Sequence, residues 1–209
     1  MTPEIERLVS NYPQLAKISN DIDKVAEMLI NAFGSGGKLL LCGNGGSAAD
    51  CEHIVGELLK EFKIKRPLPE NRKKRLLALG ASDDYIKNVS GALPAVSLVN
   101  SMGYITAFVN DVNADYVFAQ QLYALGNCND ILLAISTSGN SPNIVNAAIM
   151  AQSQDIKVIG LTGATGGKLR DLCDVVIKVP ECDTARIQEL HLPIYHTICE
   201  IVERYFWGE

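Results

Sequence analysis

The chain has 209 residues, of which 47% are hydrophobic and 21% are charged, and its formal net charge is -5. This balance excludes a disordered or fibrous protein, because such chains are poor in apolar residues or repeat a short pattern. The negative net charge also argues against a protein that binds nucleic acid over its whole surface. We therefore expect a globular chain with one well-formed core.

The N-terminal residues lack the basic-then-apolar pattern of a secretory signal, and no apolar run is long enough to span a bilayer. Six cysteines are scattered along the chain without a CxxC pair, so we expect reduced thiols rather than disulfides. These features predict a cytoplasmic protein without a membrane partner.

Residues 4–33 repeat apolar side chains at helical spacing, with an interruption at "NYPQL". This pattern predicts one or two helices that pack on another surface, such as a second subunit. The "GSGG" at 34–37 should end the helical region. We expect a single domain over residues 1–209, with residues 1–33 as an N-terminal helical extension.

Five short apolar runs follow, and helical patterns such as "PNIVNAAIMAQSQ" separate most of them. Short apolar strands that alternate with amphipathic helices predict an α/β fold with a parallel sheet covered on both faces. The predicted strands are "KLLLCG" (38–43), "YITAFVN" (104–110), "DILLAIS" (130–136), "KVIGLTG" (157–163) and "VVIKVP" (175–180).

A basic segment lies between the first two runs. Prolines and cations predict a long loop over residues 62–80, and residues 82–103 could hold one or two helices. Eight of the 19 basic residues fall within sixteen positions. They either belong to a loop that is exposed to solvent, or they attract an anionic ligand or partner. These residues are Lys60, Lys63, Lys65, Arg66, Arg72, Lys73, Lys74 and Arg75.

Two loops rich in glycine and serine each follow a predicted strand and precede a predicted helix. The unpaired N–H groups at such a helix start favour an anion, although either loop alone could be an ordinary turn. Neither loop matches a dinucleotide or P-loop fingerprint. Two such loops on one sheet favour a small phosphorylated ligand. The loops are Asn44-Gly45-Gly46-Ser47 and Ser136-Thr137-Ser138-Gly139-Asn140-Ser141.

Two of the three histidines belong to pairs with a possible metal-binding partner. His53 and Glu57 are four residues apart and share a helix face just after the first loop. Gln188 and His196 are eight residues apart, or about 12 Å along a helix, so they reach one site from two sides or one of them serves a neighbouring subunit. These side chains suit zinc, but a His–Glu pair can also be purely structural.

The last helical stretch holds two further residues of interest. His191 lies on another face of the predicted helix, and we expect it to be structural or exposed. Pro193 removes a backbone hydrogen bond to Glu189, so the helix is expected to bend there.

Several motifs resemble the sugar isomerase (SIS) domain, and within it the phosphoheptose isomerases. The resemblance runs from about Asp21 to the C-terminus. It implies a flavodoxin-like three-layer α/β sandwich, and a homotetramer with active sites at the subunit interfaces. The motifs are "CGNGGSAADCEHIVGE", "NDVNADYVFAQQL", "AISTSGNSPNIVNA", "GLTGATGGKLRDLCD" and "ARIQELHLPIYH".

The resemblance also implies catalytic, zinc-binding and substrate-binding residues. The family reaction converts sedoheptulose 7-phosphate into D-glycero-D-manno-heptose 7-phosphate through an ene-diol, with Glu57 as base and His196 as acid. One zinc ion per subunit would be bound by His53, Glu57, Gln188 and His196. The sugar phosphate would contact Asn44, Gly45, Gly46, Ser47, Glu57, Asn110, Asp111, Ser136, Thr137, Ser138, Ser141 and Gln188.

Three features depart from the family pattern. Glu61 stands where a basic residue commonly helps to bind substrate, the segment between Glu57 and Asp111 is longer, and Pro193 is unusual. A different ketose phosphate is therefore an alternative substrate. A second alternative is a non-catalytic adaptor of the replication-initiator-associating type, but those proteins lack the complete histidine and glutamate set that this chain retains.

Overall fold

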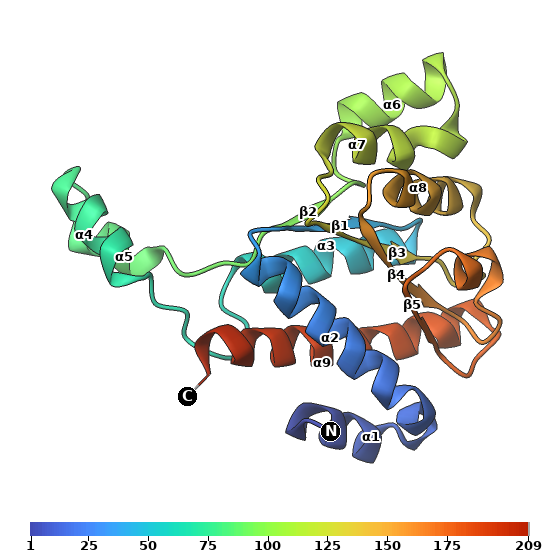
Figure 1. Ribbon diagram of the computed structural model, residues 1–209, viewed down its shortest axis with the longest axis horizontal. Coiled ribbons are helices and arrows are strands. Elements are labelled where there is room, and N and C mark those ends of the chain that lie inside the picture. Colours follow the sequence, from blue (N-terminus) through green and yellow to red (C-terminus); the bar gives the residue numbers. More distant parts are fainter. Residues whose placement is uncertain (209) are drawn as a thin grey trace.

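The computed structural model describes residues 1–208 and arranges them as an α/β sandwich (Figure 1). The strands are β1 (Leu39–Cys42), β2 (Ala95–Ser97), β3 (Ile131–Ile135), β4 (Lys157–Thr162) and β5 (Val175–Lys178). The α-helices are α1 (Pro3–Asn11), α2 (Ser19–Gly34), α3 (Gly46–Leu59), α4 (Glu70–Ala78), α5 (Asp83–Asn88), α6 (Met102–Asp111), α7 (Val117–Leu125), α8 (Pro142–Ser153) and α9 (Thr184–Trp207). Short 3₁₀ helices are η1 (Pro13–Ile18), η2 (Ala114–Tyr116) and η3 (Gly167–Asp171).

The strands form one parallel sheet in the order β2-β1-β3-β4-β5. Leu40 of β1 lies opposite Val96 of β2 on one side and Leu132 of β3 on the other. This is the flavodoxin-like strand order. β2 is added on one side of β1 and the later strands on the other, so the strand order reverses between β1 and β3. The predicted α/β class with a parallel sheet is confirmed. The carboxyl ends of β1 and β3 therefore meet at one edge of the sheet.

Alternate side chains of the strands build two separate cores. Leu39 and Leu41 face a cluster that includes buried residues of α2, α3 and α9. Leu40 and Cys42 face the opposite cluster, which α7 and α8 complete. Because successive strand residues point to opposite faces, fully apolar strands are expected when helices cover both sides. The molecule thus has three layers, as predicted.

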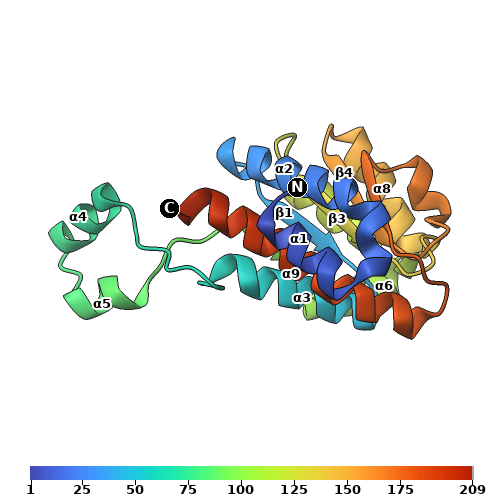
Figure 2. The ribbon, with the colours of Figure 1, turned by 90° about the horizontal axis from the view of Figure 1, so that it is seen from below.

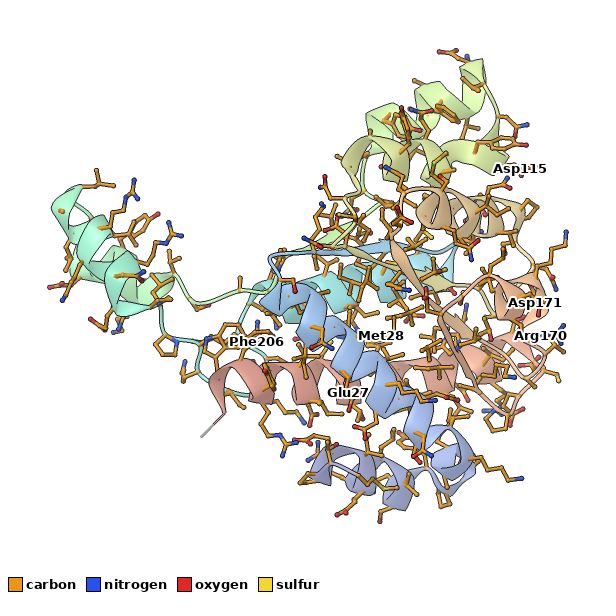
Figure 3. The ribbon with its side chains drawn as sticks, in the orientation of Figure 1. Glu27, Met28, Asp115, Arg170, Asp171 and Phe206 are labelled. Carbon is orange, nitrogen blue, oxygen red and sulfur yellow. The ribbon has the colours of Figure 1, made fainter. Side chains whose placement is uncertain are left out.

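The N-terminal helices lie against α9 (Figure 1). Ile22, Val25 and Leu29 of α2 are buried in the same core as the sheet. At the other end of α2, the ring of Phe33 lies 6.4 Å from that of Phe206, which Figure 3 labels near the end of α9. The interrupted helical pattern at residues 4–33 is therefore confirmed as two α-helices joined by a 3₁₀ turn.

One predicted strand is wrong, because residues 104–110 lie within the helix α6. Tyr104 and Ile105 lie one helical turn before Phe108, and all three side chains pack against the second core from one side. A short apolar run does not distinguish a strand from a helix by itself. The second strand of the chain is instead β2, a three-residue edge strand.

The segment at residues 62–80 was predicted as a loop, and this prediction is also wrong in part. Residues 70–78 form α4, which starts directly after Pro69. Lys, Arg, Leu and Ala are good helix formers, and the prolines lie before the helix rather than inside it. Within residues 82–103, α5 confirms a predicted helix, whereas β2 was not predicted.

Pro193 does not end α9, which continues from Thr184 to Trp207. The hydroxyl of Thr197 donates a hydrogen bond to the carbonyl of Pro193 at 2.8 Å. His191 is fully buried, and its Nε2 lies 3.4 Å from the carbonyl oxygen of Thr162. The structural interpretation of His191 is therefore confirmed.

The buried imidazole of His191 should make stability depend on pH. Burial lowers its pKa from 6.5 to about 4. The unfolded chain therefore binds the proton first as the pH falls. Stability is complete above pH 6.5, declines between 6.5 and 4, and the total loss is roughly 3 kcal/mol. Urea unfolding of the protein and of His191→Gln measures this, and the variant should lose that part of the pH dependence. An unchanged pH dependence in the variant would contradict the assignment.

Two general expectations can be compared with the described residues. All six cysteines are free thiols, as predicted, and Cys42 and Cys51 are buried. Between residues 1 and 208, no helix is both long enough and apolar enough to cross a bilayer.

Candidate active site

Three of the four predicted zinc ligands lie together where α3 packs on α9. His53 and Glu57 come from α3, and His196 comes from α9. The Nε2 atom of His53 is 3.3 Å from Glu57 Oε1 and 3.3 Å from His196 Nε2. The possible ligand atoms of the three residues lie within 4.8 Å of one another. The spacing of four residues places His53 and Glu57 on adjacent turns of one helix face.

These three residues suit a zinc ion chemically. Two imidazole nitrogens and a carboxylate are ordinary zinc ligands. The hydroxyl of Tyr195 lies 3.0 Å from Nδ1 of His53, so Nδ1 has its own partner and Nε2 points toward His196. Two facing ring nitrogens at 3.3 Å are well placed to bind one cation between them. The arrangement therefore fits the expected metal.

The fourth predicted ligand, Gln188, lies at the other end of this helix pair. Its amide group packs against Gly46 at the start of α3, where an added Cβ would be 2.6 Å from Gln188 Nε2. In residues 1–208, no hydrogen bond joins Gln188 to His53, Glu57 or His196. Gln188 therefore lies beside the first glycine loop, about two helical turns from His196.

Two residues of this region were missed by the sequence analysis. The hydroxyl of Tyr195 contacts Asp50 Oδ1 at 3.3 Å as well as His53, and Tyr195 is buried. Burial raises the pKa of Asp50, and the hydrogen bond from Tyr195 acts in the opposite direction. Asp50 is three residues before His53, so the helical face that carries His53 and Glu57 was the signal that could have indicated it.

The two serine and glycine loops lie side by side at the carboxyl edge of the sheet. Asn44 in the first loop and Asn143 near the start of α8 exchange two side-chain hydrogen bonds of 2.9 Å. In the second loop, the hydroxyl oxygens of Ser136 and Ser141 are 3.1 Å apart. Ser138 Oγ accepts a hydrogen bond from the backbone N–H of Asn140 at 3.1 Å. Several hydroxyls thus gather at the N-terminus of α8, where an anion is favoured.

A third loop supports the second one from behind. Gly139 has a φ of +66°, and a Cβ added there would lie 2.1 Å from the carbonyl oxygen of Gly166. The side chain of Asn140 accepts a hydrogen bond from the backbone N–H of Lys168 at 3.0 Å. The serine loop is therefore held in one conformation by its contact with residues 166–168.

The variant Gly139→Ala should disturb both stability and phosphate binding. Ala is strained at this φ, and its Cβ would push against the Gly166 backbone, so we expect a loss of about 1–3 kcal/mol and a raised KM for a phosphorylated substrate. Urea unfolding and steady-state kinetics measure the two effects. Gly34→Ala is the control, because nothing lies within 4 Å of its added Cβ. Equal behaviour of the two variants would contradict this account.

Asn110 and Asp111 are not brought to the serine loops by this chain alone. Both are exposed at the end of α6, where the amide of Asn110 donates to Asp111 Oδ1 at 2.7 Å. The following turn is tied to α8, since Asn146 donates to the carbonyl of Asp115, which Figure 3 labels there. Among the described residues, neither Asn110 nor Asp111 makes a hydrogen bond with residues 136–141.

The comparisons with known proteins agree with this arrangement. The sequence model of the SIS domain matches residues 5–75 and 84–163, which is more than half of the chain. The chain belongs to the SIS domain family. Its parallel sheet and its two loops at the carboxyl ends of β1 and β3 are thus those of an SIS domain.

Relatives place this SIS chain among the phosphoheptose isomerases. It is 37% identical over 206 residues to the phosphoheptose isomerase of Burkholderia pseudomallei, covering 99% of this chain and 92% of the relative. It is 41% identical over 190 residues to that of Shewanella denitrificans, covering 90% and 85%. The solved phosphoheptose isomerase of Neisseria gonorrhoeae is 33% identical, with a TM-score of 0.75 over 96% of this chain and 93% of that one. That of Francisella tularensis is 32% identical, with a TM-score of 0.77 over 95% and 94%.

The unusual residue Glu61 stabilises the turn that follows α3. Glu61 accepts hydrogen bonds from the backbone N–H of Arg66 at 3.1 Å and from Lys65 Nζ at 2.9 Å. The contact with Lys65 is the main cause that lowers the pKa of Glu61. Lys60 Nζ, by contrast, donates to Glu57 Oε2 at 2.8 Å. The cation nearest to Glu57 therefore comes from Lys60, whereas Glu61 faces its own loop.

Proposed function

We propose that this chain is a phosphoheptose isomerase that converts sedoheptulose 7-phosphate into D-glycero-D-manno-heptose 7-phosphate. The observation that carries the proposal is the intact group of His53, Glu57 and His196 in a chain that matches phosphoheptose isomerases over nearly its whole length. The same group argues against a non-catalytic adaptor. A different ketose phosphate is the second candidate, because Glu61 and the long segment after it are unusual.

We assign the metal site to His53, Glu57 and His196. Gln188 lies about two helical turns from His196, so as the fourth ligand it would serve the site of a neighbouring subunit. One zinc ion per subunit is consistent with this donor set. Bound there, zinc supplies a Lewis acid for the sugar carbonyl. The amide of Gln188 packs against Gly46 of the first glycine loop, so it is near enough to this loop to contact substrate as well.

The proton transfers are assigned to Glu57 and His196. Glu57 takes the proton from C1 of the ketose, which gives the ene-diol, and a proton is returned to C2 to give the aldose. His196 moves the proton between the two oxygens. Burial lowers the pKa of His196, which favours the neutral ring that would bind zinc through one nitrogen and exchange a proton at the other. The atoms balance, because ketose and aldose are isomers.

The phosphate is assigned to the two loops at the sheet edge. Hydroxyls of Ser136, Thr137, Ser138 and Ser141 and the N-terminus of α8 would bind its oxygens, while Asn44, Gly45, Gly46 and Ser47 border the sugar chain. Binding energy from this remote group positions the reacting carbons. Asn110 and Asp111 are exposed, so we propose that they contact the sugar bound to a neighbouring subunit of a homotetramer.

The test is turnover of sedoheptulose 7-phosphate by zinc-loaded protein, followed by NMR, with fructose 6-phosphate as a comparison. We expect the heptose aldose to form and metal analysis to give one zinc per subunit. Turnover of fructose 6-phosphate alone would overturn the substrate assignment. No turnover of either sugar, together with no bound zinc, would overturn the isomerase assignment and favour an adaptor.

A further inference from the structure

The helices α4 and α5 form an arm that stands away from the rest of the molecule. We define the arm as residues 62–94, between α3 and β2. It projects from the body in both views, on the side opposite α6 and α7 (Figures 1 and 2). Neither α4 nor α5 contains a buried residue. The matched parts of the SIS sequence model leave out residues 76–83, which lie at the tip of this arm.

The tip of the arm consists of two short helices with exposed apolar side chains. α4 has nine residues and α5 has six, and isolated helices shorter than about 12–15 residues are marginal in water. Four large apolar side chains are exposed on or beside these helices: Leu77 at 48%, Leu79 at 77%, Tyr85 at 50% and Val89 at 41%. Contact with another molecule would bury these side chains and stabilise both helices.

The stem of the arm is fixed to the body at Arg66. Arg66 is fully buried and donates to Glu203 Oε1 at 2.7 Å, to the carbonyl of Leu58 at 2.7 Å and to that of Glu57 at 2.8 Å. The returning segment of the stem is tied to Arg66 as well, since the N–H of Gly91 donates to the carbonyl of Arg66 at 2.6 Å. The direction of the arm is therefore set at its base.

The charge of the arm indicates what covers it. Residues 62–94 carry eight Lys and Arg against three Asp and Glu, a net charge of +5, whereas the whole chain has -5. The remainder of the chain therefore has a net charge of -10. A basic arm on an acidic body is complementary to a second copy of the same chain.

One face of the body matches the arm in both charge and apolar character. Residues 102–125, from the start of α6 to the end of α7, contain no Lys, Arg or Glu, and they contain two Asp, Asp111 and Asp115. α6 has no buried residue although it is rich in apolar side chains. We call α6 and α7 with the turn between them the α6–α7 face. Its exposed large apolar side chains are Met102, Val109, Val112, Tyr116, Tyr123 and Leu125.

We propose that the arm of one subunit docks on the α6–α7 face of a second copy of this chain. Leu77, Leu79 and Tyr85 cover apolar side chains of that face, and the cations of α4 lie near Asp111 and Asp115. The apolar contacts provide the buried area, and the charges select the orientation.

Zero-length cross-linking of a mixed assembly tests the proposal. One co-expressed chain carries Lys73→Arg and Lys74→Arg, and the other carries Asp111→Asn and Asp115→Asn. A carbodiimide link between Lys73 or Lys74 and Asp111 or Asp115 in this mixture joins two different chains. We expect that link. If it does not form while the link between Lys157 and Asp174, an exposed pair 2.7 Å apart within one chain, does form, the proposal is overturned.

Sedimentation velocity gives a second readout. Arg72→Ser with Arg75→Ser should raise the dissociation constant of the assembly at least about tenfold, which corresponds to 1.4 kcal/mol. Arg170→Ser is the control, since Arg170 is an exposed cation on the far side of the body, beside Asp171 (Figure 3). Equal dissociation constants for the two variants would overturn the proposal. Neither readout uses isomerase activity, so a failure here is distinct from a failure of the proposed function.

Discussion

Glu57→Gln is expected to lower kcat for sedoheptulose 7-phosphate by about 10²–10⁴-fold, the range for loss of a general base. The amide keeps the size of the side chain but cannot accept the proton from C1. Glu57 is 8% exposed and lies 3.3 Å from His53, so water has little room to replace it. Steady-state kinetics with zinc content measured in parallel would separate loss of the base from loss of the metal.

Glu61→Gln is the matched control for this experiment. Glu61 is four residues further along and contacts only Lys65 and the turn that leads to Arg66. The kcat of Glu61→Gln should stay within about twofold of that of the unchanged protein, because the carboxylate of Glu61 is not assigned to proton transfer. If Glu57→Gln retained full activity with zinc bound, Glu57 would not be the base.

Arg66→Ala is expected to lower the free energy of unfolding by about 3–5 kcal/mol, the cost of breaking a buried ion pair. Arg66 and Glu203 are both fully buried. Glu203 also accepts hydrogen bonds from the backbone N–H groups of Phe62, Lys63 and Ile64 at 2.8 to 3.1 Å. Removing Arg66 leaves the carboxylate buried without its cation, and it also frees two carbonyls at the end of α3.

Urea unfolding of Arg66→Ala and of Lys65→Ala measures this effect. Lys65 is the neighbouring cation, but its side chain is 89% exposed, so its replacement should change stability little. Arg66→Lys should fall between the two, because the three contacts of Arg66 come from three different nitrogens of its planar guanidinium, and the single nitrogen of Lys does not reproduce their spacing. Similar midpoints for Arg66→Ala and Lys65→Ala would show that the buried pair does not hold the stem.

Much of the sheet could be predicted from the sequence, because β1, β3 and β4 are short apolar runs that are buried on both faces, and β5 is a half-buried apolar run at the sheet edge. The strand predicted at 104–110 is wrong because its apolar residues form one face of a helix. A window of seven residues is too short to distinguish a helix from a strand. β2 was missed because it has only three residues and lies at the sheet edge, so its sequence shows almost no hydrophobic pattern.

The candidate site was predictable where its residues share one helix. His53 and Glu57 are four apart, and this spacing alone gives their contact. The contacts of Tyr195 with Asp50 and His53 join residues 145 and 142 positions apart, and no local pattern reports such a pairing. The position of Gln188 against Gly46 likewise depends on how α9 packs on α3.

The most direct test of the proposed chemistry is the reaction of sedoheptulose 7-phosphate in D₂O with zinc-loaded protein. Proton transfer through an ene-diol, with exchange of the proton at the base, predicts that the aldose carries deuterium at C2. Glu57→Gln should form product and label at least about 100 times more slowly. An aldose without deuterium at C2 would contradict proton exchange at Glu57, and label that persists in the variant would assign the base to another residue.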